Sequence, residues 1–384
     1  MTIKDKHEKH AKLSRPHLGE FHRNEWAILG TTCNNIRLLA NKIIQELYAK
    51  YKIAYVDADH KTPQTDADSA LVHGAALEYT DMITYRSFNF KQTFNPFQYR
   101  NLFNEQDAVL VNGNHFTGQA QIVVIDPIKP LDQKLEKLTN VQLILLADGV
   151  TTIPDYITRH LAVGSAAPIL KLSDTLAIAN FIDKHLTQHQ SQLNGLVLAG
   201  GQSQRMQTDK GSLTYFGKSQ RLHVHELLSV HCAETYISYA NTQAVNQQEQ
   251  LPVVLDTFMG LGPFGGILSA MQSNTNAAWL TVACDLPYLS AQTLAYLVAH
   301  RNPSKIATCF MDSDGKFPEP LITIWEPRAY PVMLQFLSQG YSCPRKVLIN
   351  SDVELLQAPV INDLQNVNYP EEHQAAMAHL LKTS

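Results

Sequence analysis

The sequence is short of charge, of cysteine and of long apolar runs, and each shortage excludes a class of protein. Charged residues make up 17% of the 384 residues and the net charge is −4, so no basic surface for nucleic acid is indicated. No apolar run reaches the roughly 18–20 residues that cross a bilayer. The five cysteines are odd in number, widely spaced and without a CxxC pair, which argues against a disulfide framework or zinc site. Residues 1–21 read as a flexible polar tail without the apolar core of a secretory signal, so we expect a cytoplasmic protein that binds neither nucleic acid nor membrane.

Hydrophobic residues make up 45% of the chain, and they gather in short runs that alternate with amphipathic patterns. Such alternation predicts parallel sheets covered by helices on both faces. In the first half the predicted strands are 26–30, 52–59, 107–113, 121–127, 141–148 and 168–172, with helices over 36–50 and 173–186. In the second half they are 193–199, 234–241, 252–256, 278–285, 305–310, 320–325 and 346–349.

The polar stretch TQHQSQ at 187–192 separates these two series and predicts a domain boundary. We therefore expect an α/β protein with two three-layer domains, each with a mainly parallel sheet, over residues 22–189 and 193–384. The first has the strand–loop–helix start of a P-loop domain in degenerate form, and the second has a Rossmann-like pattern.

The second domain opens with the motif VLAGGQSQRMQTDKG at 197–211. Gly200 and Gly201 permit a sharp turn and a close approach of backbone to a ligand. Arg205 and Lys210 add positive charge, so the motif predicts a phosphate-binding loop. The alternative interpretation is an ordinary strand–turn–helix junction with exposed cations.

Two further segments place polar or flexible residues at the ends of predicted strands. Asp256 ends one strand and is followed by MGLGPFGGI at 259–267, which contains Gly262 and Gly265. Asp285, in CDLPY, ends the strand AWLTVA. Because ligands of open α/β sheets bind at the carboxyl ends of strands, Asp285 could hold Mg²⁺ against phosphates. It could instead cap the following helix.

These segments resemble, in order, the molybdenum cofactor guanylyltransferase (MobA) family of nucleotidyltransferases. The resemblance implies transfer of GMP from GTP to molybdopterin cofactor, with release of pyrophosphate. It implies catalytic roles for Arg205, Lys210 and Asp285, with Mg²⁺ on Asp285. The nucleotide-binding residues that it implies are Leu198, Ala199, Gly200, Gly201, Lys210, Asn241, Asp256, Gly262 and Gly265. Asn366 and Asn368 match a family element on the pterin side, although they could equally cap the last helix. The resemblance also implies cofactor insertion proteins or target molybdoenzymes as partners.

The first domain resembles the molybdopterin-guanine dinucleotide biosynthesis adapter protein (MobB). A Walker A motif starting at Gly30 would need Gly, Lys and Ser or Thr at 35–37, where the chain has Asn, Ile and Arg. We expect no NTP hydrolysis there, although Thr31, Thr32 and Arg37 could still contact an anion. The aromatic stretch at 84–100 could either pack over the first sheet or stack on nucleotides, and packing is favoured.

Three functions remain open besides guanylyl transfer. The chain could use CTP in place of GTP, or could act on a sugar or polyol phosphate. It could also be a non-catalytic cofactor-binding or adapter protein, because Gln207 stands where the family has glycine and the Walker motif is incomplete.

Overall fold

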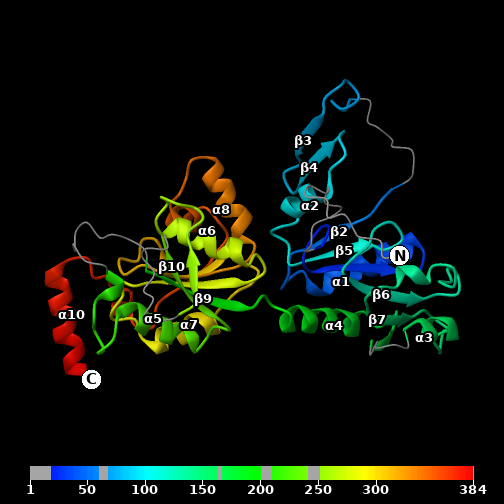
Figure 1. The fold of residues 1–384 in the computed structure, drawn as a ribbon. Coiled ribbons are helices and arrows are strands. Elements are labelled where there is room, and N and C mark those ends of the chain that lie inside the picture. Colours follow the sequence, from blue (N-terminus) through cyan, green and yellow to red (C-terminus); the bar gives the residue numbers. More distant parts are fainter. Residues whose placement is uncertain (1–18, 60–67, 162–166, 200–209, 241–250, 384) are drawn as a thin grey trace, which may run out of the picture. The chain divides into compact units, whose positions relative to one another are not determined.

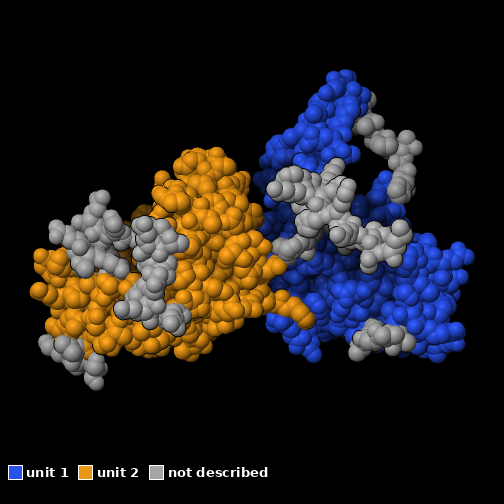
Figure 2. All heavy atoms as spheres, in the orientation of Figure 1, with its two compact units in different colours: residues 1–188 blue, residues 189–384 orange. Residues whose placement is uncertain are grey.

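The structure is a computed structural model that describes residues 19–59, 68–161, 167–199, 210–240 and 251–383. The chain divides into two compact units, Met1–Gln188 (unit 1) and His189–Ser384 (unit 2), which Figure 2 colours separately. Across the described ranges, no helix is both long and apolar enough to span a membrane.

Unit 1 is built on a six-stranded sheet in which every described pair of neighbours is parallel (Figure 1). All six apolar runs predicted for this half lie on its strands, so the prediction of a parallel sheet is confirmed. The spatial order is β2 (Ile53–Val56), β5 (Ala108–Asn112), β1 (Glu25–Leu29), β6 (Ala120–Ile125), β7 (Val141–Leu146) and β8 (Ile169–Lys171).

Helices cover the sheet of unit 1 because its strands are apolar on both faces. On one face, Trp26 and Ile28 of β1 pack with α1 (Cys33–Leu47) and α4 (Thr175–Gln188), which confirms the two predicted helices. On the other face, Leu29 packs with α3 (Asp155–Leu161). A short 3₁₀ helix, η1 (Leu135–Lys137), lies in the connection after β6.

The aromatic stretch of unit 1 folds into regular structure that the sequence did not predict. β3 (Leu77–Asp81) and β4 (Arg86–Phe90) form an antiparallel hairpin, and α2 (Pro96–Leu102) follows it (Figure 1). Asn95 caps α2 in a capping box with Gln98. The ring of Tyr99 in α2 lies 5.1 Å from that of Phe21, which packs on the sheet, so this part of the aromatic stretch packs as predicted. Tyr85 and Phe88 are more than half exposed.

Unit 2 is built on a seven-stranded sheet that is parallel except around one strand. That strand, β14, pairs antiparallel with both of its neighbours. The spatial order is β11 (Val253–Leu255), β10 (Thr235–Tyr239), β9 (Leu193–Leu198), β12 (Ala278–Ala283), β14 (Pro318–Trp325), β13 (Ala307–Met311) and β15 (Glu354–Leu356). The expectation of a mainly parallel sheet is therefore confirmed here too.

Helices cover both faces of this sheet and complete three layers. α5 (Gln220–Ser229) and α7 (Ala291–Ala299) pack on one face. α6 (Pro263–Ser273), α8 (Ala329–Ser338) and α9 (Pro344–Ile349) pack on the other. The remaining elements are η2 (Lys210–Ser212), η4 (Ile361–Leu364) and α10 (Pro370–Thr383).

One predicted strand of unit 2 is wrong, because residues 346–349 lie in α9. A run of three apolar residues after Lys346 fits a buried strand and a buried helical turn equally well. Pro344 decides between them, since proline at the first helical position already has the φ angle that a helix needs. The strand at this edge of the sheet is instead β15, further along the chain.

We expect Gly30→Ala to destabilise unit 1 by about 2–4 kcal/mol. Gly30 has φ +93°, and an added Cβ would lie 2.2 Å from the carbonyl oxygen of Val124 on β6. Gly149→Ala is the matched control, because Gly149 has φ +80° with open space around it and should lose only about 1–2 kcal/mol. The free energy of unfolding of both variants can be measured by urea unfolding, with hydrogen exchange of peptides from unit 1 as the signal. Equal losses of stability in the two variants would contradict the steric argument.

Candidate functional site

The candidate site lies at the carboxyl ends of the parallel strands of unit 2. β9 and β12 are neighbours in parallel register, with Leu198 opposite Ala283. Both Leu198 and Ala199 are buried, so the chain enters its glycine motif directly from the core. Asp285 follows two residues after Ala283 and is partly exposed. The end of β9 and the carboxylate of Asp285 therefore belong to the same edge of the sheet, as predicted.

The chain near its C-terminal end is fixed against this edge. The backbone N–H of Val367 donates to the carbonyl oxygen of Asp285 at 2.8 Å. This bond places Asn366 and Asn368 beside the turn that carries the carboxylate. The Glu372 side chain accepts from the backbone N–H of Asn368 at 2.7 Å and so orders the start of α10. The structure thus brings together two segments more than eighty positions apart in sequence.

Further charged side chains that the sequence did not point to gather near Asp285. Val282 of β12 pairs with Ile322 of β14, and Asp285 and Glu319 each lie three residues beyond that pair, toward the same edge. Arg345 bridges Glu319 at 3.2 Å and Asp312 at 3.3 Å. The only sequence signal was a glutamate between two prolines in FPEP, which does not reveal its partners.

Glu319 is a buried carboxylate at this edge with charges of both signs nearby. Burial chiefly raises the pKa of Glu319, and the charges of Asp285 and Asp312 raise it further. The backbone N–H of Leu321 and the charge of Arg345 act in the opposite direction. Burial, with smaller contributions from Tyr288 and Asp285, likewise raises the pKa of Tyr215 to about 12. The charges of Asp285 and Glu319 therefore act on each other across this edge.

Asp256 and the glycine segment form a second part of the same edge. Asp256 follows β11 and accepts a hydrogen bond from the Ser238 hydroxyl at 3.0 Å. The pKa of Asp256 is raised overall, because the effect of burial exceeds the opposite effect of the hydrogen bond from Ser238. Gly262 precedes α6. Gly265 lies in its first turn, where an added Cβ would meet the Phe258 carbonyl oxygen at 2.2 Å. The loop and the start of the helix therefore pack closely against each other.

Not all of the predicted residues can be placed. Gly200, Gly201, Arg205 and Asn241, and the side chain of Lys210, lie outside the described residues. Strands β10 and β9 separate β11 from β12, so Asp256 and Asp285 lie along one edge rather than in contact. Within the part of the chain that the structure describes, no three His, Cys, Asp or Glu side chains are grouped as a metal site.

Unit 1 places its own polar loop after β1, where a P-loop would lie. The Thr31 hydroxyl donates to Asp126 at 2.5 Å, and Thr32 caps α1 by accepting from the Asn35 N–H. Arg37 pairs with Asp57 at 3.0 Å. The three groups that could have contacted an anion therefore contact other parts of unit 1.

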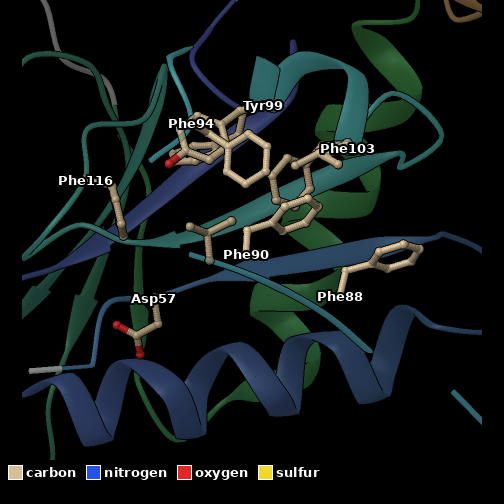
Figure 3. Close-up of a pocket in the computed structure, with 10 residues that line it drawn as sticks. Asp57, Phe88, Phe90, Phe94, Tyr99, Phe103 and Phe116 are labelled. Atoms are coloured by element: carbon tan, nitrogen blue, oxygen red, sulfur yellow. The ribbon is translucent and has the colours of Figure 1, made fainter. Parts of the chain in front are cut away.

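A cavity of about 470 Å³ lies between the hairpin, α2 and the sheet of unit 1. Its lining is mainly aromatic, and Figure 3 shows Asp57 apart from the group of rings. Both oxygens of Asp57 are already engaged, since they accept from Arg37, Tyr55, Asn112 and the Ala58 N–H. The cavity is thus an apolar hollow whose one carboxylate is already fully hydrogen-bonded.

A mainly parallel α/β sheet with carboxylates and a helix start at its strand ends places unit 2 among the open α/β domains that bind ligands at the carboxyl ends of their strands. The comparisons with known proteins identify the class of this domain as nucleotidyltransferase. The family model described as "MobA-like NTP transferase domain" matches residues 195–355. A molybdenum cofactor guanylyltransferase from Vibrio atlanticus is 31% identical over 192 residues, which cover 47% of this chain and 94% of that protein. The chain therefore belongs to the molybdenum cofactor guanylyltransferase family.

Two further similarities cover part of the chain. A protein from Synechocystis named "Molybdenum cofactor biosynthesis bifunctional protein" is 34% identical over 185 residues, or 48% of this chain. The chain spans about half of that relative, 53% of its length. A crystal structure titled molybdopterin-guanine biosynthesis protein B (mobB) matches 42% of this chain and 99% of its own, with 15% identity and a TM-score of 0.30.

Proposed function

We propose that unit 2 transfers GMP from GTP to molybdopterin cofactor. The observation that carries this proposal is the 31% identity to a named guanylyltransferase over 94% of its length. In the reaction, an oxygen of the terminal phosphate of molybdopterin attacks the α-phosphorus of GTP. A new P–O bond forms, and the bond to the β-phosphate breaks as pyrophosphate leaves with its electron pair. The attacking phosphate is already an anion, so the protein mainly aligns the reactants and neutralises charge.

We infer the roles of the residues from the family resemblance and, for those that the structure describes, from their positions at the strand ends. We assign the triphosphate to the loop at Gly200 and Gly201, with Arg205 and Lys210 balancing its charge. Leu198 and Ala199 lead into that loop from the buried end of β9. We propose that the rest of the nucleotide is bound by Asn241, Asp256, Gly262 and Gly265. The segment that carries Asn366 and Asn368 is hydrogen-bonded to the turn at Asp285. We therefore propose that this segment binds the pterin, next to the reacting phosphates.

The residues at this edge fit one Mg²⁺. Mg²⁺ keeps several waters and takes one or two protein carboxylates together with substrate phosphates. Asp285 supplies such a carboxylate at a strand end, within the negative field shared with Glu319. When bound, the ion would neutralise phosphate charge. Arg345 holds Glu319 in a salt bridge, which leaves Asp285 as the ligand that we propose.

Incubation of the chain with molybdopterin cofactor, Mg²⁺ and either GTP or CTP tests the proposal. We expect pyrophosphate and the guanine dinucleotide form, identified by mass spectrometry, with GTP and not with CTP. Preference for CTP would identify a cytidylyltransferase, and pyrophosphate release only with sugar or polyol phosphates would identify a different acceptor. Absence of product with every acceptor would favour a non-catalytic binding protein.

We infer that unit 1 is an adapter that does not hydrolyse NTP, since its loop groups are engaged within the protein. Tethering it to unit 2 raises the effective concentration of one unit near the other without new contacts. We place the reaction in the cytoplasm, where cofactor insertion proteins or target molybdoenzymes would receive the product.

A further inference from the structure

A cysteine of unit 1 lies at the point of its sheet where ligands of α/β folds bind. β1 and β6 are neighbours, but β1 connects through α1 to β2 on one side, and β6 connects to β7 on the other. Such a change of direction marks the place, at the carboxyl ends of the two strands, where ligands of open α/β sheets generally bind. Cys33 is the first residue of α1, which directly follows β1, and so it lies at this place. The hydrogen bond between Thr31 and Asp126 joins the two strand ends there.

Cys33 is paired with a histidine and an asparagine from a third strand end. Its sulfur lies 3.3 Å from Nε2 of His115, and the Asn114 side-chain amide donates to the sulfur at 3.4 Å. The same amide donates to the carbonyl oxygen of Thr31 at 3.1 Å, which fixes the turn after β5 against the loop after β1. A thiol within hydrogen-bonding distance of an oriented imidazole is the arrangement that generates a nucleophilic thiolate.

The charges around the thiol favour its ionised form. Burial raises the pKa of Cys33, but the side-chain amides of Asn112 and Asn114 and the positive charge of Lys129 outweigh it, so the pKa is lowered overall. Asp57 acts weakly against this, and its charge is paired with Arg37 at 3.0 Å.

The wider surroundings act in the same direction. The pKa of Lys129 is lowered by burial and by nearby Lys134 and Lys137, whereas Cys33 raises it, so the cation and the thiol favour each other's charged forms. The start of a 15-residue helix adds a further preference for negative charge at its first residue.

The other cysteines lack this environment. Cys284 and Cys309 are buried, and burial raises the pKa of Cys232 and Cys309 to about 12. Cys343 in unit 2 is exposed and immediately precedes α9. It is therefore an internal control: an accessible thiol, also at a helix start, to compare with Cys33 and its partners.

We propose that Cys33 is a reactive thiol that exchanges with small disulfides, with His115 as its proton acceptor. The proton of the thiol passes to the imidazole, and the Cys33 thiolate attacks one sulfur of the disulfide. A new S–S bond forms to Cys33, and the old S–S bond breaks. The leaving sulfur departs with the electron pair and takes a proton, so it is reduced as Cys33 is oxidised.

The reaction of the full chain with 5,5′-dithiobis(2-nitrobenzoate) tests the proposal. We expect a fast phase of one equivalent that C33S removes and C343S retains. The rate of this phase should increase with pH, and the midpoint of the increase should lie below about pH 8.5, the ordinary pKa of a cysteine thiol. The midpoint of the Cys343 phase, measured in the same way, is the reference. Glutathione disulfide should add one glutathione to the peptide 24–37, as seen by mass spectrometry, and dithiothreitol should remove it.

Variants of the partners separate activation from packing. H115Q and N114A should each raise the midpoint, and at pH 6.5 they should slow the Cys33 phase by about tenfold per unit of that rise. Unchanged thermal unfolding would show that the fold is intact. A fast phase that survives in C33S, or a Cys33 midpoint equal to that of Cys343, would overturn the proposal. A Cys33 midpoint unchanged in H115Q would overturn the assignment of His115.

Discussion

Asp285→Asn should lower the rate of nucleotidyl transfer by about 10²–10³-fold or more, which is the usual cost of losing one group that stabilises transition-state charge. The substitution keeps the shape of the side chain and removes its negative charge. The backbone bond from Val367 to the Asp285 carbonyl oxygen does not depend on the side chain, so the fold should persist. Measurement of kcat and KM for GTP at saturating acceptor and Mg²⁺ would show the loss mainly in kcat.

Asp352→Asn is the matched control for this prediction. Asp352 is an exposed carboxylate of the same unit and pairs with Lys305 at 2.6 Å. Its replacement removes the same charge from unit 2 but not from the strand-end edge, so transfer should stay within about twofold of the parent rate. Comparable losses in the two variants would mean that net charge, and not the position of Asp285, sets the rate.

Arg301→Ala and Glu326→Ala should each destabilise unit 2 by about 3–5 kcal/mol, because each leaves a buried charge without its partner. Arg301 donates to both oxygens of Glu326, at 2.7 and 2.9 Å, and also to the carbonyl oxygen of Ser191. The side chains are only 11% and 2% exposed. Urea unfolding, followed by hydrogen exchange of peptides from β12, measures the loss.

The exposed pair Lys305–Asp352 is the control for this ion pair. Its side chains are 29% and 47% exposed, so Lys305→Ala should cost less than about 1 kcal/mol. The double variant Arg301→Met with Glu326→Leu should recover much of the stability lost in the single variants, because neither charge is then buried alone. A double variant as unstable as the sum of the two singles would contradict this explanation.

The layers of both units could be predicted from sequence because continuous apolar runs identify strands that are buried on both faces. Prediction failed where length and pattern were ambiguous. Residues 346–349 suit a strand or a helical turn equally, and the aromatic stretch at 84–100 contains a strand whose hairpin partner, β3, has no long apolar run. The antiparallel direction of β14 could not be predicted, because its amino-acid composition does not differ from that of a buried parallel strand.

The candidate site could be predicted as far as single residues at strand ends, of which Asp256 and Asp285 are examples. Their partners could not, because these depend on pairing between distant segments. Thr31 and Asp126 lie 95 positions apart and meet only because β1 and β6 are neighbours. Arg345 likewise reaches Glu319 from a helix that the sequence presented as a strand.

The reversed direction of β14 has a consequence for how unit 2 can change. A parallel strand brings its last residues to the reactive edge, whereas β14 brings its first residues, Pro318 and Glu319, and turns its far end away. The turn over residues 312–317 therefore borders the edge that carries Asp285, and the segment after Trp325 lies at the opposite edge. Under the proposed function, length changes in the turn over 312–317 would alter the edge that we propose binds the substrates, while those after Trp325 would leave that edge unchanged. The inverted strand thus determines which of its two flanking loops borders the proposed site.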